Sequence, residues 1–224
     1  MNLDFLPRFR PLGDSAILIS LGETISAESS DLVLGLSELV WEKKIEGVTD
    51  CIPAYATVLI KYDPLRVDYE TLSGVIQPML TRMKNAGRSA GRITEIPVYY
   101  GGKYGPDLTE VVRHTGLSPE EVIRLHSGAE YAVCFIGFLP GFPYLSGMDS
   151  RLATPRLATP RQLVPAGSVG IAGSQTGIYP LDSPGGWQII GQSFLAIFDP
   201  KREPPALLMA GDRVRFIPAI GGIN

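Results

Sequence analysis

Cysteine and histidine are scarce in this chain of 224 residues, which contains two of each. Cys51 and Cys134 stand far apart, so they offer neither the close spacing of a zinc site nor the density of a disulfide scaffold. His114 and His126 have no cysteine beside them and make a poor metal site. The sequence therefore predicts no bound metal. His126 stays a weaker functional candidate because it directly precedes a β-rich region.

An excess of charge of either sign is also missing, with 20 Lys and Arg against 23 Asp and Glu. This balance gives no electrostatic footprint for DNA or RNA, so nucleic acid is not an expected partner. The longest uncharged stretches, residues 131–148 and 162–181, are laced with Gly, and we interpret them as buried strands and loops rather than membrane spans. The N-terminal residues hold charges and prolines where a signal peptide needs an apolar run, so a cytoplasmic location is expected.

Several common catalytic motifs are absent from the sequence. It contains no G-x-x-x-x-G-K phosphate loop, no G-x-G-x-x-G, no G-x-S-x-G and no H-E-x-x-H. A nucleophilic triad is not visible either. Any nucleotide site must therefore be of a non-standard kind or be shared with a partner chain.

Glycine and proline are abundant instead, with 25 and 19 residues. Charge is unevenly spread, because residues 1–130 carry 31 charged side chains and residues 131–198 carry only five. Hydrophobic residues make up 45% of the chain, enough for a real core. These patterns favour a first half of ordinary helices and strands and a second half of short strands joined by turns.

Alternating strands and helices are expected in the first half. Residues 15–21 predict a strand, and apolar residues recur at helical spacing after possible caps at residues 29–31. A β-rich run follows at residues 51–62. A second helix is expected after an Asp68 cap, and Pro78 should kink or shorten it.

Small, polar and basic residues at 84–92 predict a linker between two domains. We place a small α/β domain at residues 1–86 and a second domain at residues 87–224, which makes the fold class α+β. The second domain is expected to open with a strand at residues 93–100.

Two short helices are expected next. Asp107 and Glu110 have capping-box spacing, and Ser118 is followed by Pro119, which suits the first helical position. Beyond residue 130 the pattern favours many strands joined by Gly and Pro turns, which fits a closed barrel without exposed edges. The expected strands are residues 131–138, 168–172, 187–191, 193–198 and 212–217, with a hairpin break at Gly191-Gln192.

A rigid turn carrying several aromatic rings is predicted by the run GFLPGFPYL at residues 137–145. Phe138 and Pro140 lie in it. The run is equally compatible with a hydrophobic plug in the core and with a pocket wall whose glycine backbone approaches a ligand closely.

Arginines at residues 151, 156 and 161 are almost the only charges in the middle segment. Arginine binds carboxylate or phosphate through a planar two-pronged contact, so this series suggests an anion site. Solvated loop arginines are the alternative.

Small residues, hydroxyls, an amide and two aromatic side chains crowd into residues 164–187. Such a run can offer backbone N–H groups to an anion or to a developing oxyanion. Tight barrel turns without a ligand are the alternative. We favour the ligand site because Gln175, Tyr179 and Trp187 lie so close to these turns.

Taken together and in this order, the runs PLGDSAILI, GFLPGFPYL, VPAGSVGIAGSQTGIYP, SPGGWQIIGQ and GDRVRF resemble the family of 5-oxoprolinase B subunits. That family is also described as allophanate hydrolase subunit 1 and includes the sporulation histidine-kinase A inhibitor. The resemblance covers nearly the whole chain. It implies a small N-terminal α/β domain and a cyclophilin-like β-barrel domain.

The activity implied by the resemblance is ATP-dependent opening of 5-oxo-L-proline to L-glutamate, in an assembly with the A and C subunits of 5-oxoprolinase. ATP with Mg would be a co-substrate, at a site shared with a partner chain. This chain has no biotin-attachment segment, so no biotin is expected on it. The alternative that the resemblance leaves open is a regulator that binds a sensor histidine kinase and blocks its autophosphorylation. A prolyl isomerase with a similar barrel is a third, weaker reading.

The resemblance also implies site residues by motif position. Arg156 and Arg161 are expected to bind anionic oxygens, while Ser168 and Gln175 would donate to the lactam. We group Arg156, Arg161 and Gln175 as catalytic candidates. The substrate-binding candidates are Phe138, Pro140, Ser168, Tyr179, Gly186 and Trp187, and the weaker candidates are Asp107 and His126.

Overall fold

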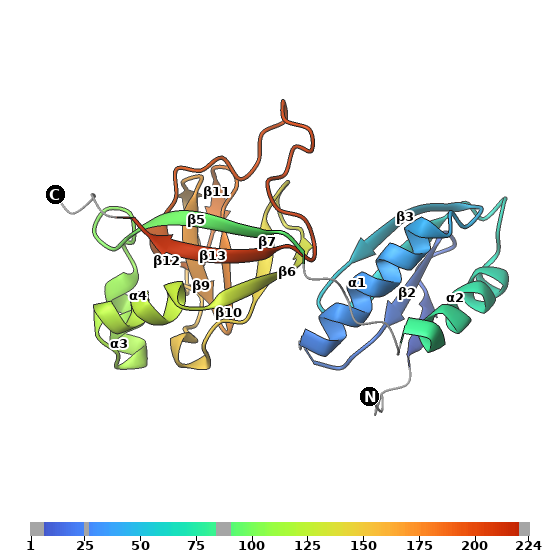
Figure 1. The fold of residues 1–224 in the computed structure, drawn as a ribbon, viewed down its shortest axis with the longest axis horizontal. Coiled ribbons are helices and arrows are strands. Elements are labelled where there is room, and N and C mark those ends of the chain that lie inside the picture. The colour runs from blue at the N-terminus through green and yellow to red at the C-terminus, as the bar shows by residue number, and fades with distance from the viewer. Residues whose placement is uncertain (1–6, 25–26, 84–90, 220–224) are drawn as a thin grey trace. The chain divides into compact units, whose positions relative to one another are not determined.

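The computed structural model describes residues 7–24, 27–83 and 91–219. The chain divides into two compact units, residues 1–89 and residues 90–224 (Figure 1). Within those described ranges, no helix is both long enough and apolar enough to cross a membrane. The candidate site residues named above all lie in the second unit.

The first unit is a four-stranded antiparallel sheet with two helices. Its sheet order is β1-β2-β4-β3. Alternate strand residues such as Ile17, Ile19 and Ile60 are fully buried and pack with the apolar faces of both helices in one core. The elements are β1 (Arg8–Pro11), β2 (Ala16–Ser20), α1 (Ala27–Glu42), β3 (Val48–Pro53), β4 (Thr57–Tyr62) and α2 (Tyr69–Met83).

Three details of this unit differ from the sequence-based expectation. The β-rich run at residues 51–62 is not one strand but the hairpin of β3 and β4. Helix α1 begins at Ala27, before the expected caps. Pro78 does not shorten α2, which continues to Met83. The Asp68 cap is confirmed, because the Thr71 amide donates to its carboxylate at 2.7 Å. The linker was expected at residues 84–92, and residues 84–90 of it lie outside the described ranges.

The second unit contains the expected closed barrel. Seven strands form it in the order β10-β7-β6-β13-β5-β12-β9, and β8 and β11 form a separate two-stranded sheet. The elements are β5 (Ile93–Tyr100), α3 (Leu108–Thr115), α4 (Pro119–Ser127), β6 (Glu130–Ile136), β7 (Pro143–Ser146), η1 (Ser150–Leu152), β8 (Arg161–Val164), β9 (Ser168–Ala172), β10 (Gln175–Ile178), β11 (Ser183–Gly185), β12 (Gln188–Gln192) and β13 (Arg213–Pro218).

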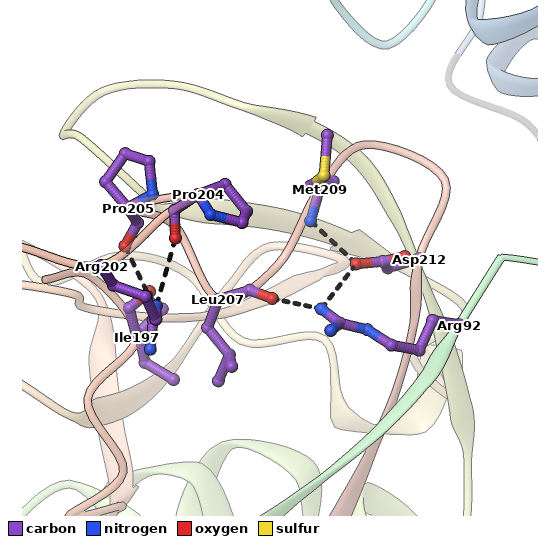
Figure 2. Close-up of polar contacts among 8 residues, drawn as sticks. All are labelled: Arg92, Ile197, Arg202, Pro204, Pro205, Leu207, Met209 and Asp212. Carbon is purple, nitrogen blue, oxygen red and sulfur yellow. Dashed lines mark hydrogen bonds and ion pairs between the residues drawn. The ribbon is translucent and has the colours of Figure 1, made fainter.

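The strand expected at residues 193–198 is wrong. Gly191 and Gln192 are the last residues of β12 rather than a hairpin break, and the chain then forms a long loop up to residue 212. Figure 2 shows side-chain contacts that help to hold this loop. The Arg202 guanidinium donates to the carbonyls of Ile197 and Pro205 at 3.2 and 2.9 Å.

Arg92 anchors the other end of the same loop (Figure 2). Its guanidinium donates to the Leu207 carbonyl at 2.5 Å and contacts the Asp212 carboxylate at 3.4 Å. The same carboxylate accepts the Met209 amide at 3.0 Å. Two arginines thus add side-chain hydrogen bonds to a loop that backbone amides also hold, since Leu207 donates to the Ile197 carbonyl at 2.8 Å and Asp199 to the Pro205 carbonyl at 2.9 Å.

Candidate functional site

Two glycines, Gly170 and Gly177, lie on the outer face of β9 and β10 where two aromatic side chains cover it. Successive strand residues point to opposite faces, so Val169, Ile171 and Ile178 face the barrel core. On the outer face a Cβ at Gly170 would lie 3.1 Å from the Trp187 Cβ, and one at Gly177 would lie 3.0 Å from the Phe142 ring. Any larger residue at either position would push these side chains away from the strands by a few tenths of an ångström.

Four rings form what we call the aromatic cluster: Phe142, Tyr144, Tyr179 and Trp187. Phe142 is central, with edge-on contacts at ring-centroid distances of 5.0, 5.3 and 5.4 Å to the other three. Gly185 leaves room for the Tyr179 hydroxyl, which a Cβ there would strike. The cluster packs with Val164, Ala172 and Ile189, outside the barrel core.

Arg156 is held over this cluster by three contacts of the residues around it. Thr154 forms an isolated bridge with Gly173. The Gln188 side-chain amide donates to the Pro155 carbonyl at 2.9 Å, and the Leu157 amide donates to the Gly186 carbonyl at 2.7 Å. The Arg156 guanidinium carbon then lies 5.9 Å from the centre of the Trp187 ring, a cation–π arrangement.

Arg161 approaches the same cluster from β8 and is paired with Asp107. Its Nη2 lies 2.6 Å from Asp107 Oδ1, while Asp107 Oδ2 accepts the Ile189 backbone amide at 2.7 Å. The Nη1 atom of Arg161 is buried and has no acceptor among the described residues. Asp107 makes no cap hydrogen bond to α3, so the expected Asp107–Glu110 capping box is wrong, whereas the one at Ser118 and Glu121 is present.

The positive charges of Arg156 and Arg161 both act on the Tyr179 hydroxyl. Burial raises the pKa of its hydroxyl, and the backbone amide of Trp187 and the guanidinium groups of Arg156 and Arg161 act in the opposite direction. The hydroxyl therefore stays protonated at neutral pH, within the field of two cations. Such a place favours an anionic ligand.

Six of the predicted residues are thus brought together by the structure. Gly186 belongs to this group because its carbonyl anchors Leu157 and its α-carbon faces Pro160. The third arginine of the series does not, since Arg151 pairs on the surface with Asp149 at 2.6 Å. The six are Asp107, Arg156, Arg161, Tyr179, Gly186 and Trp187.

Ser168 and Gln175 lie on the outer face but at opposite ends of the β9–β10 hairpin. Gln175 pairs with Ala172 beside the hairpin turn, whereas Ser168 is at the far end of β9. Four residues of strand separate these levels, a distance of about 13 Å. The shared role that we expected for them on one small lactam is not supported by this arrangement.

Phe138 and Pro140 are at the rim of the aromatic cluster. Phe138 is 63% exposed and meets the Phe142 ring edge-on at 5.6 Å. Its φ of +66° is unusual for a residue with a bulky side chain and stores backbone strain of about 1–3 kcal/mol. Pro140 is exposed beside it. A direct role for either residue in binding a substrate stays a prediction.

His126 lies inside the barrel, away from the aromatic cluster. Thr176 donates its only hydroxyl proton to the Gly170 carbonyl, so it accepts from His126 Nε2 at 2.9 Å. His126 Nδ1 then accepts from the Tyr100 hydroxyl at 2.8 Å. The ring also stacks on Phe216 at 4.7 Å. These contacts make His126 a neutral core residue rather than part of the anion site.

Burial lowers the pKa of His126 to about 3, and this gives a pH-dependent stability. An unfolded histidine titrates near 6.5, so between these values the unfolded chain binds more protons and stability falls as the pH drops. We expect His126→Gln to remove about 2–3 kcal/mol of the loss between pH 7 and pH 4.5. Denaturant unfolding at both pH values measures it. His114→Gln, at an exposed position, is the matched control, and an identical pH dependence in both variants would contradict the prediction.

Sequence reasoning missed three contributors to this site. Gln188 is 4% exposed and orients the residue before Arg156, but an isolated glutamine in a strand carries no signal of that role. Phe142 and Tyr144 were visible only as part of an aromatic-rich turn. Among the described residues, no group of three or more His, Cys, Asp or Glu is arranged to hold a metal ion.

Comparisons with known proteins show which family the chain resembles. Residues 7–208 match the family described as carboxyltransferase domain, subdomain C and D. The chain belongs to this family. It is also 44% identical over 216 residues to the B subunit of 5-oxoprolinase from Bacillus subtilis, covering 92% of this chain and 90% of that one. The resemblance seen in the sequence is thus confirmed.

Two solved structures of longer proteins contain a region that resembles this carboxyltransferase-family chain. The crystal structure of TTHA0988 is 42% identical with a TM-score of 0.80, and the match covers 93% of this chain but only 40% of that one. Urea amidolyase of K. lactis is 21% identical with a TM-score of 0.76, covering 98% of this chain and 15% of that one. At that identity the second match shows the fold alone. In both proteins, a unit like this chain occurs together with further sequence.

Proposed function

We propose that the chain is one component of an ATP-dependent 5-oxoprolinase, which opens 5-oxo-L-proline to L-glutamate together with its A and C subunits. The observation that carries the proposal is the convergence of Arg156 and Arg161 on the aromatic cluster, with a buried guanidinium nitrogen left without an acceptor among the described residues. The name of the relative from Bacillus subtilis, a 5-oxoprolinase component, supports it. ATP is available in the cytoplasm, where we propose that the protein works.

The chemistry explains why such a site needs two cations. A lactam is a poor electrophile, so its oxygen is first phosphorylated by ATP, which leaves as ADP. Water then attacks the activated ring carbon, and the C–N bond breaks to give a free amine and an acyl phosphate. A second water hydrolyses the acyl phosphate to give glutamate and inorganic phosphate. Guanidinium groups stabilise the carboxylate of the substrate and the charge on the transferred phosphoryl group.

Each residue of the site has a distinct task in this proposal. Arg161 binds the substrate carboxylate, and Arg156 binds the phosphoryl oxygens. Tyr179 and Trp187 form the wall against which the ring packs and which keeps water away from the activated lactam. ATP and Mg are held jointly with a partner chain, because the sequence lacks a phosphate loop.

Inhibition of a histidine kinase is the competing function. A docking inhibitor needs a surface that fits the kinase, but it has no need of a buried guanidinium nitrogen without an acceptor among the described residues. The described residues offer no observation that favours kinase binding. We therefore propose the enzymatic function alone.

Reconstitution tests the proposal. The full chain is purified with its cognate A and C subunits, and glutamate release from 5-oxo-L-proline is measured with ATP and Mg. We expect glutamate only when all three chains and ATP are present, with one ADP formed for each ring opened. No glutamate from the complete mixture, together with tight binding to a sensor histidine kinase, would replace this function by the regulatory one.

A further inference from the structure

Asp107 breaks a local rule of helix formation. It occupies the N-cap position of α3, where aspartate normally accepts a backbone N–H of the first turn, yet its side chain makes no such bond. Its two oxygens instead accept from Arg161 and from the Ile189 amide, both far away in the sequence. A residue that gives up a favourable local contact for a distant one points to a task outside the helix.

Arg161 shows a matching irregularity. Its side chain is 32% exposed as a whole, but Nη1 is buried without an acceptor among the described residues, whereas Nη2 is held by Asp107. A buried donor that lacks a partner is costly, and arginine is suited to grip a planar group with two nitrogens. The pair is therefore arranged with one guanidinium nitrogen fixed by Asp107 and the neighbouring one covered by protein atoms but without an acceptor among the described residues.

We infer that Asp107 is a positioning residue, which fixes the partly exposed Arg161 side chain so that its guanidinium group receives a carboxylate oxygen of the substrate. This inference rests on the proposed function and assigns the carboxylate end of the ligand to Arg161. The aspartate acts only through the arginine and does not touch the ligand.

The balance of charge distinguishes the two arginines. Arg161 already has a negative partner, so the Asp107–Arg161 pair has little net charge and suits a singly charged carboxylate. Arg156 has no carboxylate partner among the described residues and lies over the Trp187 ring, so it suits the more negative phosphoryl group. The neighbours of each arginine therefore assign the carboxylate end of an activated substrate to Arg161 and the phosphoryl end to Arg156.

The test compares Asp107→Asn and Asp107→Ser in the reconstituted assembly. Asparagine keeps the size of the side chain without its charge, and serine caps a helix as well as aspartate but is too short to reach Arg161. We expect both variants to raise KM for 5-oxo-L-proline about 10- to 100-fold, the loss expected for a charge-assisted hydrogen bond. The KM for ATP should stay within about twofold, because Arg156 is untouched.

Controls separate positioning from damage to the fold. Glu110→Gln removes only the exposed Glu110–Arg113 pair of the same helix and should leave both KM values unchanged. Inhibition by 2-pyrrolidinone, a lactam without a carboxylate, should be as strong in the Asp107 variants as in the wild type. Unchanged KM for 5-oxo-L-proline in Asp107→Asn, or equal weakening of 2-pyrrolidinone, would overturn the inference.

Direct binding keeps this test independent of the reconstituted reaction. Trp41 and Trp187 are the only tryptophans, so a Trp41→Phe chain carries Trp187 as its sole reporter beside the site. We expect 5-oxo-L-proline to change its fluorescence and Asp107→Asn to weaken that binding at least about 10-fold. An inactive wild-type assembly with this binding pattern would remove the proposed function and keep the inference. Equal affinity in wild type and Asp107→Asn, or no binding to the wild-type chain, would remove the inference.

Discussion

Arg156→Ala is expected to lower kcat/KM for glutamate formation at least about 100-fold, as the loss of one fixed charge-stabilising donor does in other enzymes. The Arg156 side chain is exposed and lies over the Trp187 ring, without a hydrogen bond or ion pair to another described residue. Removing it should therefore leave the free energy of unfolding within about 0.5 kcal/mol of the wild type. Glutamate release by the complete assembly and denaturant unfolding of the chain measure the two effects.

A neighbouring arginine supplies the matched control for that experiment. Arg151 comes from the same sequence repeat but pairs with Asp149 on the surface, so Arg151→Ala should retain full turnover. Arg156→Lys keeps a positive charge without the flat, forked donor and should fall between wild type and alanine. Full turnover in Arg156→Ala would remove this residue from the site, whatever the behaviour of Arg161.

The two arginines of the anion site could be predicted from the sequence better than the residues around them. Arginines stand out in a segment with only five charges, and two of the three in the series do reach the cluster. Arg151 does not, because a side chain two residues away in the sequence already neutralises it. The spacing of arginines along the sequence does not distinguish a guanidinium group that is paired with a carboxylate from one that is free to bind a ligand.

Long-range contacts explain the errors around Asp107 and Ser168. The D-x-x-E spacing at residue 107 is a sound capping signal, but the carboxylate is drawn to partners from β8 and β12. Ser168 and Gln175 are close in sequence and yet occupy opposite ends of a hairpin. Both errors come from pairings that are decided only when the barrel closes.

Short strands were the part of the fold that periodicity could not find. Strands β7, β8, β10 and β11 have three or four residues each, too few for an alternating pattern. All of them except β8 contain Gly, Pro or Ser, which argue for turns. The glycines of β9 and β10 have a different purpose, since they make room for rings that arrive from other parts of the chain.

Phe142→Ala should be among the most destabilising substitutions in the second unit, at about 3–5 kcal/mol. The ring is 1% exposed and touches all three other members of the aromatic cluster, and Gly177 leaves no side chain that could fill the cavity. Trp187 would lose its edge-on neighbour, so its fluorescence in a Trp41→Phe background should change as well. Phe138→Ala removes the same ring from a mostly exposed position of the same turn and should cost less than about 1 kcal/mol. Equal losses in the two variants would mean that the cluster is not a packed support for Arg156, and the wall assigned to Tyr179 and Trp187 would lose its physical basis.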